Sequence, residues 1–143
     1  MGRGISGYFT SNKENKTFYF RSLLELNFLI LIEEDNNVST YTVEPFSIKL
    51  TDNHHYTPDL LINNQYIIEL KPSKHLMYEN EERWNKEITG ATEFCNSHNF
   101  IFKVIYDTDI GFESRQYKIY LKTHPELIQK YNIKFNSDIK DWS

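Results

Sequence analysis

The sequence has few of the features that build covalent cross-links or membrane spans. Cys95 is the only cysteine among 143 residues, which excludes an internal disulfide and a zinc site made of cysteines. We expect it to be a small buried side chain. The longest apolar stretch, residues 23–32, is interrupted by Glu25 and Asn27 and is far shorter than the roughly 20 residues of a membrane span. The sequence therefore predicts no membrane-crossing segment.

Signals for export and for nucleotide hydrolysis are also missing. The glycine-rich start has no apolar core of the signal-peptide kind, so we expect a cytoplasmic protein. The absence of a GxxxxGK phosphate loop argues against ATP hydrolysis. Ser22 and Ser73 have no evident histidine partner, and a nucleophilic triad is not indicated.

Positive charge is scarce, with 16 Lys and Arg against 20 Asp and Glu and a net charge of −4. This balance argues mildly against a protein that coats nucleic acid, because phosphate contacts need Lys and Arg. The distribution is uneven, since the first 24 residues carry four bases and one acid: Arg3, Lys13, Lys16, Arg21 and Glu14. We expect residues 1–17 to form a basic flexible arm, which either lies along phosphates or is a solvated terminus.

The remaining composition is that of a globular protein. Apolar residues make up 39% and charged residues 25% of the chain, and this length suffices for a single core. We expect one domain over residues 1–143, with a polar tail at residues 132–143.

A helix is predicted after Ser22, which is a favourable N-cap and is followed three places later by Glu25, as in a capping box. Most residues from there to Ile32 are apolar, so we expect a core helix. Glu25 stands out, because a carboxylate among apolar neighbours is costly unless it caps, pairs or binds something.

Strand and helix patterns alternate in the rest of the chain. Five segments are strand candidates: residues 38–43, 46–50, 55–62, 65–71 and 100–106, the last expected to be buried. Asn63 and Asn64 predict a tight turn between the third and fourth. Apolar spacing predicts helices over about residues 78–97 and 125–130, and a strand or a helix over 116–121. This order predicts an α/β fold, a mixed sheet covered by helices.

The strand candidates 55–62 and 65–71, joined by the turn at Asn63 and Asn64, form a predicted hairpin. Charged residues interrupt its apolar strands at Asp59, Glu69 and Lys71. Side chains alternate along a strand, so Glu69 and Lys71 project to one side of the sheet and Leu70 to the other. Pairing across the turn brings Asp59 close to Glu69. Two carboxylates and an ammonium group are therefore predicted to converge. The alternative is that the acids are edge-strand charges with Lys71 as an exposed partner.

Two adjacent carboxylates repel each other unless a proton or a cation neutralises them. Mg²⁺ suits the pair, because it prefers hard oxygen ligands and commonly binds one or two carboxylates together with a phosphate. We expect Asp59 and Glu69 to bind it, the backbone carbonyl of Leu70 to add a ligand, and Mn²⁺ to substitute. Such an ion polarises a phosphate, and Lys71 would orient the attacking water or stabilise developing charge.

Pro58-Asp59 and, downstream, Glu69-Leu70-Lys71 resemble the motif of PD-(D/E)XK nucleases. That superfamily shares a restriction-endonuclease-like αβββαβ core and cuts nucleic acid with Mg²⁺. The resemblance implies the same fold and phosphodiester hydrolysis for this chain, with DNA as the partner.

A closer likeness covers roughly residues 18–107. The residues that carry it are similar to the N-terminal catalytic region of TnsA-type transposon-end endonucleases: Arg21 to Glu25, Phe28, Leu29, Tyr41, Glu44 and Pro45. In that family a helix glutamate joins the metal site, which by resemblance assigns this role to Glu25; a helix cap is the other interpretation. TnsA-type enzymes can carry Gln at the position of Glu69, where Glu fits the wider superfamily.

Related small proteins of tailed phages are regarded as head-completion nucleases. The resemblance therefore implies a phage or mobile-element origin, and phage head or neck proteins or transposition proteins as further partners. A phage-encoded protein would also be found in the virion.

Basic and aromatic side chains are candidate DNA contacts. The basic candidates, with a solvated surface as the alternative, are Arg3, Lys13, Lys16, Arg21, Lys74 and Lys86. Five aromatic residues are able to stack on unpaired bases, although core packing is expected for most: Tyr8, Phe9, Phe18, Tyr19 and Phe20. At most one of His54 and His55 touches substrate or metal, since neighbours in a strand face opposite sides.

Two classes of function stay open. The first is a magnesium-dependent DNA endonuclease whose catalytic residues are Glu25, Asp59, Glu69 and Lys71. The second is a nuclease fold that binds DNA or assembles a phage particle, which the acidic net charge slightly favours. Among nucleases, a resolvase of branched DNA such as a Holliday junction is the nearest rival, and either a monomer or a dimer is compatible with the sequence.

Overall fold

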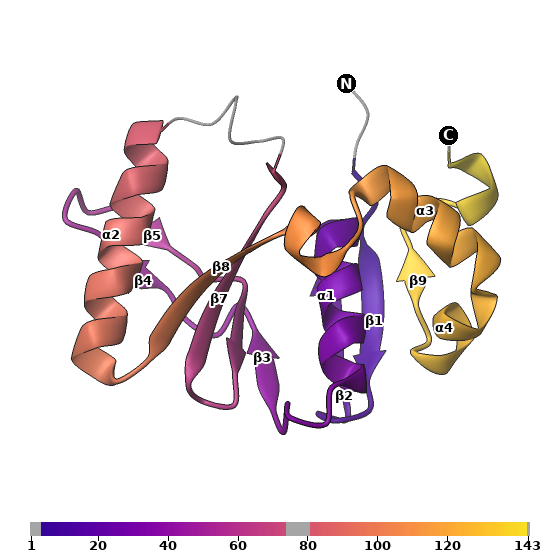
Figure 1. Ribbon diagram of the computed structural model, residues 1–143, viewed down its shortest axis with the longest axis horizontal. Helices are drawn as coiled ribbons and strands as arrows, with labels where there is room; N and C mark the ends of the chain where they lie inside the picture. The colour runs from indigo at the N-terminus through magenta and orange to yellow at the C-terminus, as the bar shows by residue number, and fades with distance from the viewer. Residues whose placement is uncertain (1–3, 74–80, 143) are drawn as a thin grey trace. The chain divides into compact units, whose positions relative to one another are not determined.

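The computed structural model describes residues 4–73 and 81–142. The chain forms two compact units. Unit 1 consists of Met1–Asn37 with Ile110–Ser143, and unit 2 consists of Val38–Asp109. Figure 1 shows the helices and strands of both units, with most of them labelled. The prediction that the whole chain is one domain stays a prediction.

Unit 1 contains a three-stranded antiparallel sheet with the strand order β2-β1-β9. β1 (Gly7–Ser11) pairs with β2 (Lys16–Phe20) on one side and with β9 (Lys134–Phe135) on the other. Alternation along the strands turns three aromatic side chains inward, where each is at most 6% exposed: Phe9, Phe18 and Phe20. One face of this sheet therefore belongs to the core of unit 1.

The structure differs from the predicted basic flexible arm at residues 1–17 and polar tail at residues 132–143. β1 and the start of β2 lie within the first segment, β9 lies within the second, and the two segments pair. Trp142, near the end of the chain, is only 7% exposed. Local patterns do not show this pairing, because it joins distant segments and β9 has only two residues.

Helix α1 (Leu23–Glu34) begins where the sequence predicts, with Ser22 as its N-cap. Ser22 Oγ accepts the backbone N–H of Glu25 at 3.2 Å, and Glu25 Oε2 accepts the backbone N–H of Arg21 at 2.7 Å. In a capping box the Glu25 side chain would accept the backbone N–H of Ser22, the N-cap residue. Here it accepts the N–H of the residue before it, so the box is shifted by one residue. Most of the helix is buried, which confirms the prediction of a core helix.

Two further helices form the C-terminal part of unit 1. Residues 116–121, predicted as a strand or a helix, lie within helix α3 (Ser114–Thr123), which contacts α1. Helix α4 (Pro125–Lys130) matches the predicted short helix. Pro125 stands at its start, where a backbone N–H would have no helical partner anyway. A 3-10 turn follows at Ile139–Asp141.

Unit 2 is built on a four-stranded mixed sheet with the order β3-β6-β7-β8. Its strands are β3 (Tyr41–Val43), β6 (Leu60–Ile62), β7 (Tyr66–Lys71) and β8 (Ile101–Tyr106). β6 is antiparallel to both neighbours, and β8 is parallel to β7, as is usual when a helix, here α2 (Glu81–His98), connects two strands. Along the chain, α1 precedes β3, and apart from two short strands between β3 and β6 the elements follow the order αβββαβ. This confirms the predicted α/β fold of the restriction-endonuclease type.

The turn between β6 and β7 confirms the predicted hairpin. Asn63 and Asn64 have φ angles of 54° and 52°, which Asn tolerates better than most residues. The N–H of Gln65 donates to the carbonyl of Ile62 at 3.0 Å. Asn63 Oδ1 accepts the backbone N–H of Ser39 at 2.7 Å and that of the next residue at 3.2 Å. The turn is thereby fixed to the segment that precedes β3.

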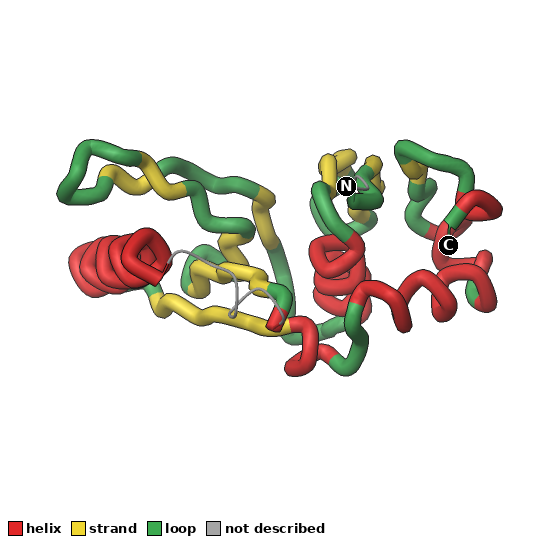
Figure 2. The backbone as a smooth tube through the Cα atoms, turned by 90° about the horizontal axis from the view of Figure 1, so that it is seen from above, coloured by secondary structure: helices red, strands yellow, loops and turns green. Residues whose placement is uncertain are grey.

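The candidate strand at residues 46–50 does not join this sheet. β4 (Ile48–Lys49) pairs with β5 (His55–Tyr56) in a separate two-stranded ribbon, so the candidate strand 55–62 is divided between this ribbon and β6. Helix α2 contacts both β4 and β8 (Figure 2). The buried residues that join the ribbon to the helix are Ile48, Leu50, Tyr56 and Ala91.

Strand β8 is less buried than its apolar sequence indicates. Ile101 is 42% exposed, because β8 is an edge strand with a neighbour on one side only. A 3-10 turn, Asp107–Ile110, follows it. The sequence alone does not show which strands lie at an edge.

The structure also bears on the predictions made for Cys95 and for membrane-crossing segments. Cys95 is 2% exposed, and burial raises the pKa of its thiol, which confirms the prediction of a small buried side chain. Over the residues that the structure describes, no helix is both long and apolar enough to cross a membrane.

Candidate active site

Asp59 and Glu69 face each other where the β6-β7 hairpin ends. Leu60 pairs with Ile68, so the same register places Asp59, directly before β6, opposite Glu69. Asp59 Oδ2 accepts the backbone N–H of Leu70 at 2.6 Å, and the two carboxyl groups share a side-chain hydrogen bond. The structure therefore brings the two acids together, while their catalytic role stays a prediction.

Glu69 is held by a tyrosine from the neighbouring ribbon. The hydroxyl of Tyr56, a residue 4% exposed, donates to Glu69 Oε1 at 2.5 Å. Burial, and after it the negative charge of Asp59, raise the pKa of Glu69 to about 8, although the bond from Tyr56 acts in the opposite direction. Near neutral pH the pair of acids therefore holds a proton, as expected for two half-buried carboxyl groups without a cation.

Lys71 lies on the same face of β7 as Glu69, and Leu70 is buried on the opposite face. Its Nζ is 4.4 Å from the centroid of the Trp84 ring on α2, a cation–π contact. The positive charge of Lys71 also lowers the pKa of Glu69. The ammonium group is thus close enough to the acids to act on them electrostatically.

The ends of β7 and β8 are joined beside Lys71 by a buried acid. Asp107, directly after β8, is 5% exposed. Its Oδ1 accepts the backbone N–H of Ser73 at 3.0 Å and that of Thr108 at 2.8 Å. Since Lys71 and Tyr106 are partners in the parallel pair, these bonds fix the chain just beyond the candidate active-site lysine.

Sequence reasoning missed the roles of Tyr56, Trp84 and Asp107. Trp84 lies within the helix predicted over about residues 78–97, and Tyr56 lies within the strand candidate 55–62, but the sequence assigned neither residue a role at the site. The one local signal is that Tyr56 is an aromatic residue in a polar run three places before Asp59. The contacts themselves join separate elements, which no local pattern reports.

Glu25 lies in unit 1, whereas Asp59 and Glu69 lie in unit 2. Its contacts include the capping bonds at the start of α1. Within neither unit, over residues 4–73 and 81–142, do three or more His, Cys, Asp or Glu side chains form a group able to hold a metal ion. The metal-binding roles of Glu25 and of the Leu70 carbonyl stay predictions.

The basic candidates for DNA contact are spread along the chain. Arg3 and Lys74 lie outside the described residues. Lys13 Nζ donates to a backbone carbonyl at the end of α1 at 2.8 Å, and Lys16 Nζ lies 5.6 Å from the ring centroid of the phenylalanine two residues on. Arg21 is exposed just before α1. DNA contact by these residues stays a prediction.

Lys86 and the two histidines lie near each other in unit 2. Lys86 Nζ is 3.5 Å from Asp52 and 3.6 Å from Glu82, and His54 Nδ1 is 3.0 Å from Asp52 Oδ2. The hydrogen bond from the His54 side chain is the main cause that lowers the pKa of Asp52 to about 2. His55 is exposed in β5. Lys86 is thus paired with acids in this structure.

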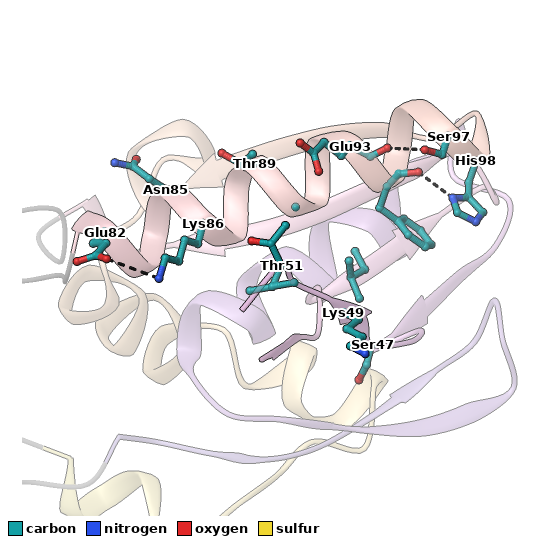
Figure 3. A pocket seen from close by; sticks show the side chains of 14 residues that line it. Ser47, Lys49, Thr51, Glu82, Asn85, Lys86, Thr89, Glu93, Ser97 and His98 are labelled. Atoms are coloured by element: carbon teal, nitrogen blue, oxygen red, sulfur yellow. Dashed lines mark hydrogen bonds and ion pairs between the residues drawn. The ribbon is translucent and has the colours of Figure 1, made fainter. Parts of the chain in front are cut away.

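A pocket of about 630 Å³ opens between β4 and α2 (Figure 3). Lys86 and His98 are among the residues that line it. The candidate residues Asp59, Glu69 and Lys71 do not line it, so this pocket is not part of the candidate active site.

The mixed sheet, with two acids and a lysine on its central hairpin, defines a restriction-endonuclease-like α/β domain. The family model described as TnsA-like endonuclease N terminal matches residues 35–107, just over half of the chain, and the chain belongs to this family. The match contains Asp59, Glu69 and Lys71 and begins after Glu25. No curated protein matches the chain. Membership of this family, which is related to PD-(D/E)XK nucleases, supports endonuclease activity, and DNA is the substrate that a nuclease domain implies.

Proposed function

We propose that this protein is a metal-dependent DNA endonuclease in which Asp59 and Glu69 bind Mg²⁺ and Lys71 assists hydrolysis of a phosphodiester bond. The observation that supports this most is the pairing of two half-buried carboxyl groups across the β6-β7 hairpin, with an ammonium group on the same face. Side chains selected only for stability would not place two acids against each other, because like charges disfavour one another in a half-buried position.

The donor set suits a hard divalent ion. Mg²⁺ commonly takes only one or two protein carboxylates, together with water and phosphate oxygens, so Asp59 and Glu69 suffice as its main protein ligands. Bound Mg²⁺ would polarise the scissile phosphate and neutralise charge on the leaving oxygen. The proposal includes the Leu70 carbonyl and Glu25 as additional ligands and Mn²⁺ as a substitute ion.

The chain's own groups have separate tasks in this proposal. Lys71 orients the attacking water or stabilises charge that develops on the phosphate. Trp84 restricts the position of the ammonium group through the cation–π contact, and Tyr56 fixes the orientation of Glu69 through its hydrogen bond. Both supporting side chains are buried, with Tyr56 4% and Trp84 8% exposed, and packing restricts their rotamers.

Cleavage of supercoiled plasmid with Mg²⁺ or Mn²⁺ tests the proposal. The parent protein should nick or linearise the plasmid, and EDTA should stop the reaction. Asp59→Asn and Lys71→Met keep the size of each side chain but remove its charge. Each is expected to slow cleavage by about 100-fold or more. If both variants cut as well as the parent, the assignment of the site is wrong.

Lys103→Met is the matched control for the lysine. Lys103 also places its Nζ over an aromatic ring, 5.2 Å from the centroid of Tyr66, but it lies on the adjacent strand β8. This variant should cut at the parental rate. Calorimetry with Mn²⁺ separates the two roles, because Asp59→Asn should lose ion binding and Lys71→Met should retain it.

The charge of unit 2 favours a second candidate, a nuclease fold that binds DNA or assembles a phage particle without cutting. Its sequence carries eleven acids against six bases, a poor balance for holding phosphates. Biological function that persists in the Asp59→Asn protein would support this candidate. If the protein cuts, cleavage of linear ends by a monomer would favour end processing, as in head completion or transposon-end cleavage. Cutting of four-way junctions by a symmetric dimer would favour a resolvase.

A further inference from the structure

The structure divides the aromatic side chains of the β1-β2 hairpin into two groups. The three phenylalanines are buried, whereas Tyr8 and Tyr19 are 53% and 46% exposed. These two tyrosines are direct partners across the strands, with ring centroids 5.3 Å apart and ring planes at 63°. The outer side of the sheet therefore presents two large rings side by side.

The neighbours of the two rings are polar or basic. Lys134 in β9 pairs with Tyr8 and is exposed, so Tyr19, Tyr8 and Lys134 form one row across three strands. Thr10 and Thr17 form the next row, with a hydrogen bond between their hydroxyls at 3.1 Å. We call these five residues the tyrosine face. No residue of β1, β2 or β9, all of which the structure describes in full, is acidic.

The sheet that carries the tyrosine face is closely packed. A Cβ on Gly7 would lie 1.8 Å from the carbonyl oxygen of Lys134, which shows how closely β1 and β9 approach. On the inner side of the sheet, Phe9 stacks on Tyr131 with ring centroids 4.9 Å apart. Exposed rings on a rigid sheet lose little conformational entropy when they bind a partner.

We propose that the tyrosine face binds an unpaired segment of the DNA substrate, with bases stacked on Tyr8 and Tyr19 and a phosphate at Lys134. Every base has a flat aromatic face, so stacking of this kind tolerates any sequence, whereas bases inside a duplex are covered by their neighbours. The inference rests on the proposed function for its substrate class. It requires neither a metal ion nor any contact between the two units.

The distribution of charge supports a nucleic-acid partner for this unit. Ten bases and nine acids occur in the sequence of unit 1, against six bases and eleven acids in unit 2. The tyrosine face itself combines rings, hydroxyl groups and one ammonium group without a carboxylate. An acidic partner with flat rings, such as single-stranded DNA, matches all three kinds of group.

Fluorescence anisotropy with labelled oligo(dT) of about 12 nucleotides, which is within the usual site size, measures this binding. EDTA is present throughout, so that no cleavage occurs. The parent should bind the single strand more tightly than a duplex of equal length. Tyr8→Thr and Tyr19→Thr, which keep a side chain suited to strands, should each weaken binding by about 10-fold. Tyr8→Phe and Tyr19→Phe should bind nearly as the parent does.

Two control variants separate stacking from general surface effects. Ile119→Thr removes another exposed apolar side chain of unit 1, 62% exposed on α3, and should bind as the parent does. Lys134→Gln should reduce the slope of log affinity against log salt concentration by about 0.7. Thermal unfolding of each variant distinguishes a loss of DNA binding from a loss of folded protein. The Phe variants keep the aromatic ring and its packing, so they test the hydroxyl group alone.

Several results would overturn the proposal. One is a folded Tyr8→Thr, Tyr19→Thr double variant that binds the single strand like the parent. Another is equal loss in the Phe and Thr variants, which would make the hydroxyl groups and not the rings responsible. A third is a dimer that dissociates in Tyr8→Thr while oligonucleotide binding is unchanged, since this would identify a protein interface.

Failure of this inference is distinguishable from failure of the endonuclease proposal. A parent protein that binds single strands through the tyrosines but never cuts DNA would refute the endonuclease and support the tyrosine face. A parent that cuts DNA, with single-strand affinity insensitive to both tyrosine changes, would refute only the tyrosine face.

Discussion

At the scale of single residues, the cost of charging Glu69 differs between the folded and the unfolded chain. The folded protein keeps a proton on this carboxyl group up to about pH 8, whereas the ordinary value is 4.5. A group with a raised pKa in the folded state contributes stability below its unfolded pKa and loses it as the pH rises through the folded pKa. The metal-free protein is therefore expected to lose stability between about pH 4.5 and pH 8.

Glu69→Gln should remove this loss. In EDTA, its free energy of unfolding at about pH 8.5 should exceed that of the parent by about 1 kcal/mol or more, because each pKa unit corresponds to about 1.4 kcal/mol. The difference should be small near pH 5. Urea unfolding across this pH range measures it, and Glu93→Gln on the exposed side of α2 controls for the loss of one charge. Parallel pH profiles for Glu69→Gln and the parent would contradict the buried pair of acids.

Tyr56 offers a second prediction at this scale. Its hydroxyl stabilises the charged form of Glu69, so Tyr56→Phe should raise the pKa of that carboxyl group further. The pH at which cleavage reaches half its maximum should shift upward by about one unit, because a hydrogen bond to a charged group contributes about 1.5–3 kcal/mol. Higher pH should restore the rate. Tyr66→Phe makes the same change elsewhere in the hairpin, and an identical shift in both variants would exclude a specific role for Tyr56.

At the scale of elements, the start of α1 separates two roles of Glu25. Glu25→Gln keeps an oxygen that can accept the N–H of Arg21 but removes the charge. If Glu25 is a metal ligand, this variant should lose most of its cleavage activity. Its free energy of unfolding should stay within about 0.5 kcal/mol of that of the parent. Ser22→Ala should do the reverse, losing about 1 kcal/mol of stability while it cuts normally. Full activity of Glu25→Gln would leave helix capping as its role.

The turn that positions the two acids allows a test with neighbouring residues. Asn63 and Asn64 share nearly the same positive φ, but the two bonds to the segment before β3 go to Asn63 Oδ1. Alanine at either position meets the same backbone strain. Asn63→Ala should therefore lose about 1–2 kcal/mol more stability than Asn64→Ala, measured by urea unfolding. Equal losses would show that backbone conformation alone accounts for the turn.

At the scale of the whole molecule, the two terminal segments of unit 1 pair through β1 and β9, which approach closely at Gly7 and Lys134. Gly7→Ala would push a methyl group against the Lys134 carbonyl, and we expect it to cost about 2 kcal/mol or more. Gly4→Ala is the control, because its Cβ would meet its nearest neighbour at an ordinary 4.0 Å. Thermal unfolding compares the two. Equal stability of both variants would contradict the pairing of β1 with β9.

Several elements were predictable because their signals are contiguous in the sequence. Ser22 and the apolar run after it define the start of α1, and the two asparagines after Ile62 define the hairpin turn. From that turn, simple counting placed Asp59 opposite Glu69. The ribbon of β4 and β5 was not predictable in this way, since residues 46–50 have the composition of a strand in any sheet.

The sequence by itself determined the αβββαβ order and the presence of two acids and a lysine on one hairpin, because alternation and turn chemistry act between near neighbours. The tertiary structure alone decided that Tyr56 holds Glu69, that Trp84 holds Lys71, and that the predicted arm and tail form one sheet. These contacts join segments far apart in the chain. Packing selects them among many pairings that the local sequence leaves equally acceptable.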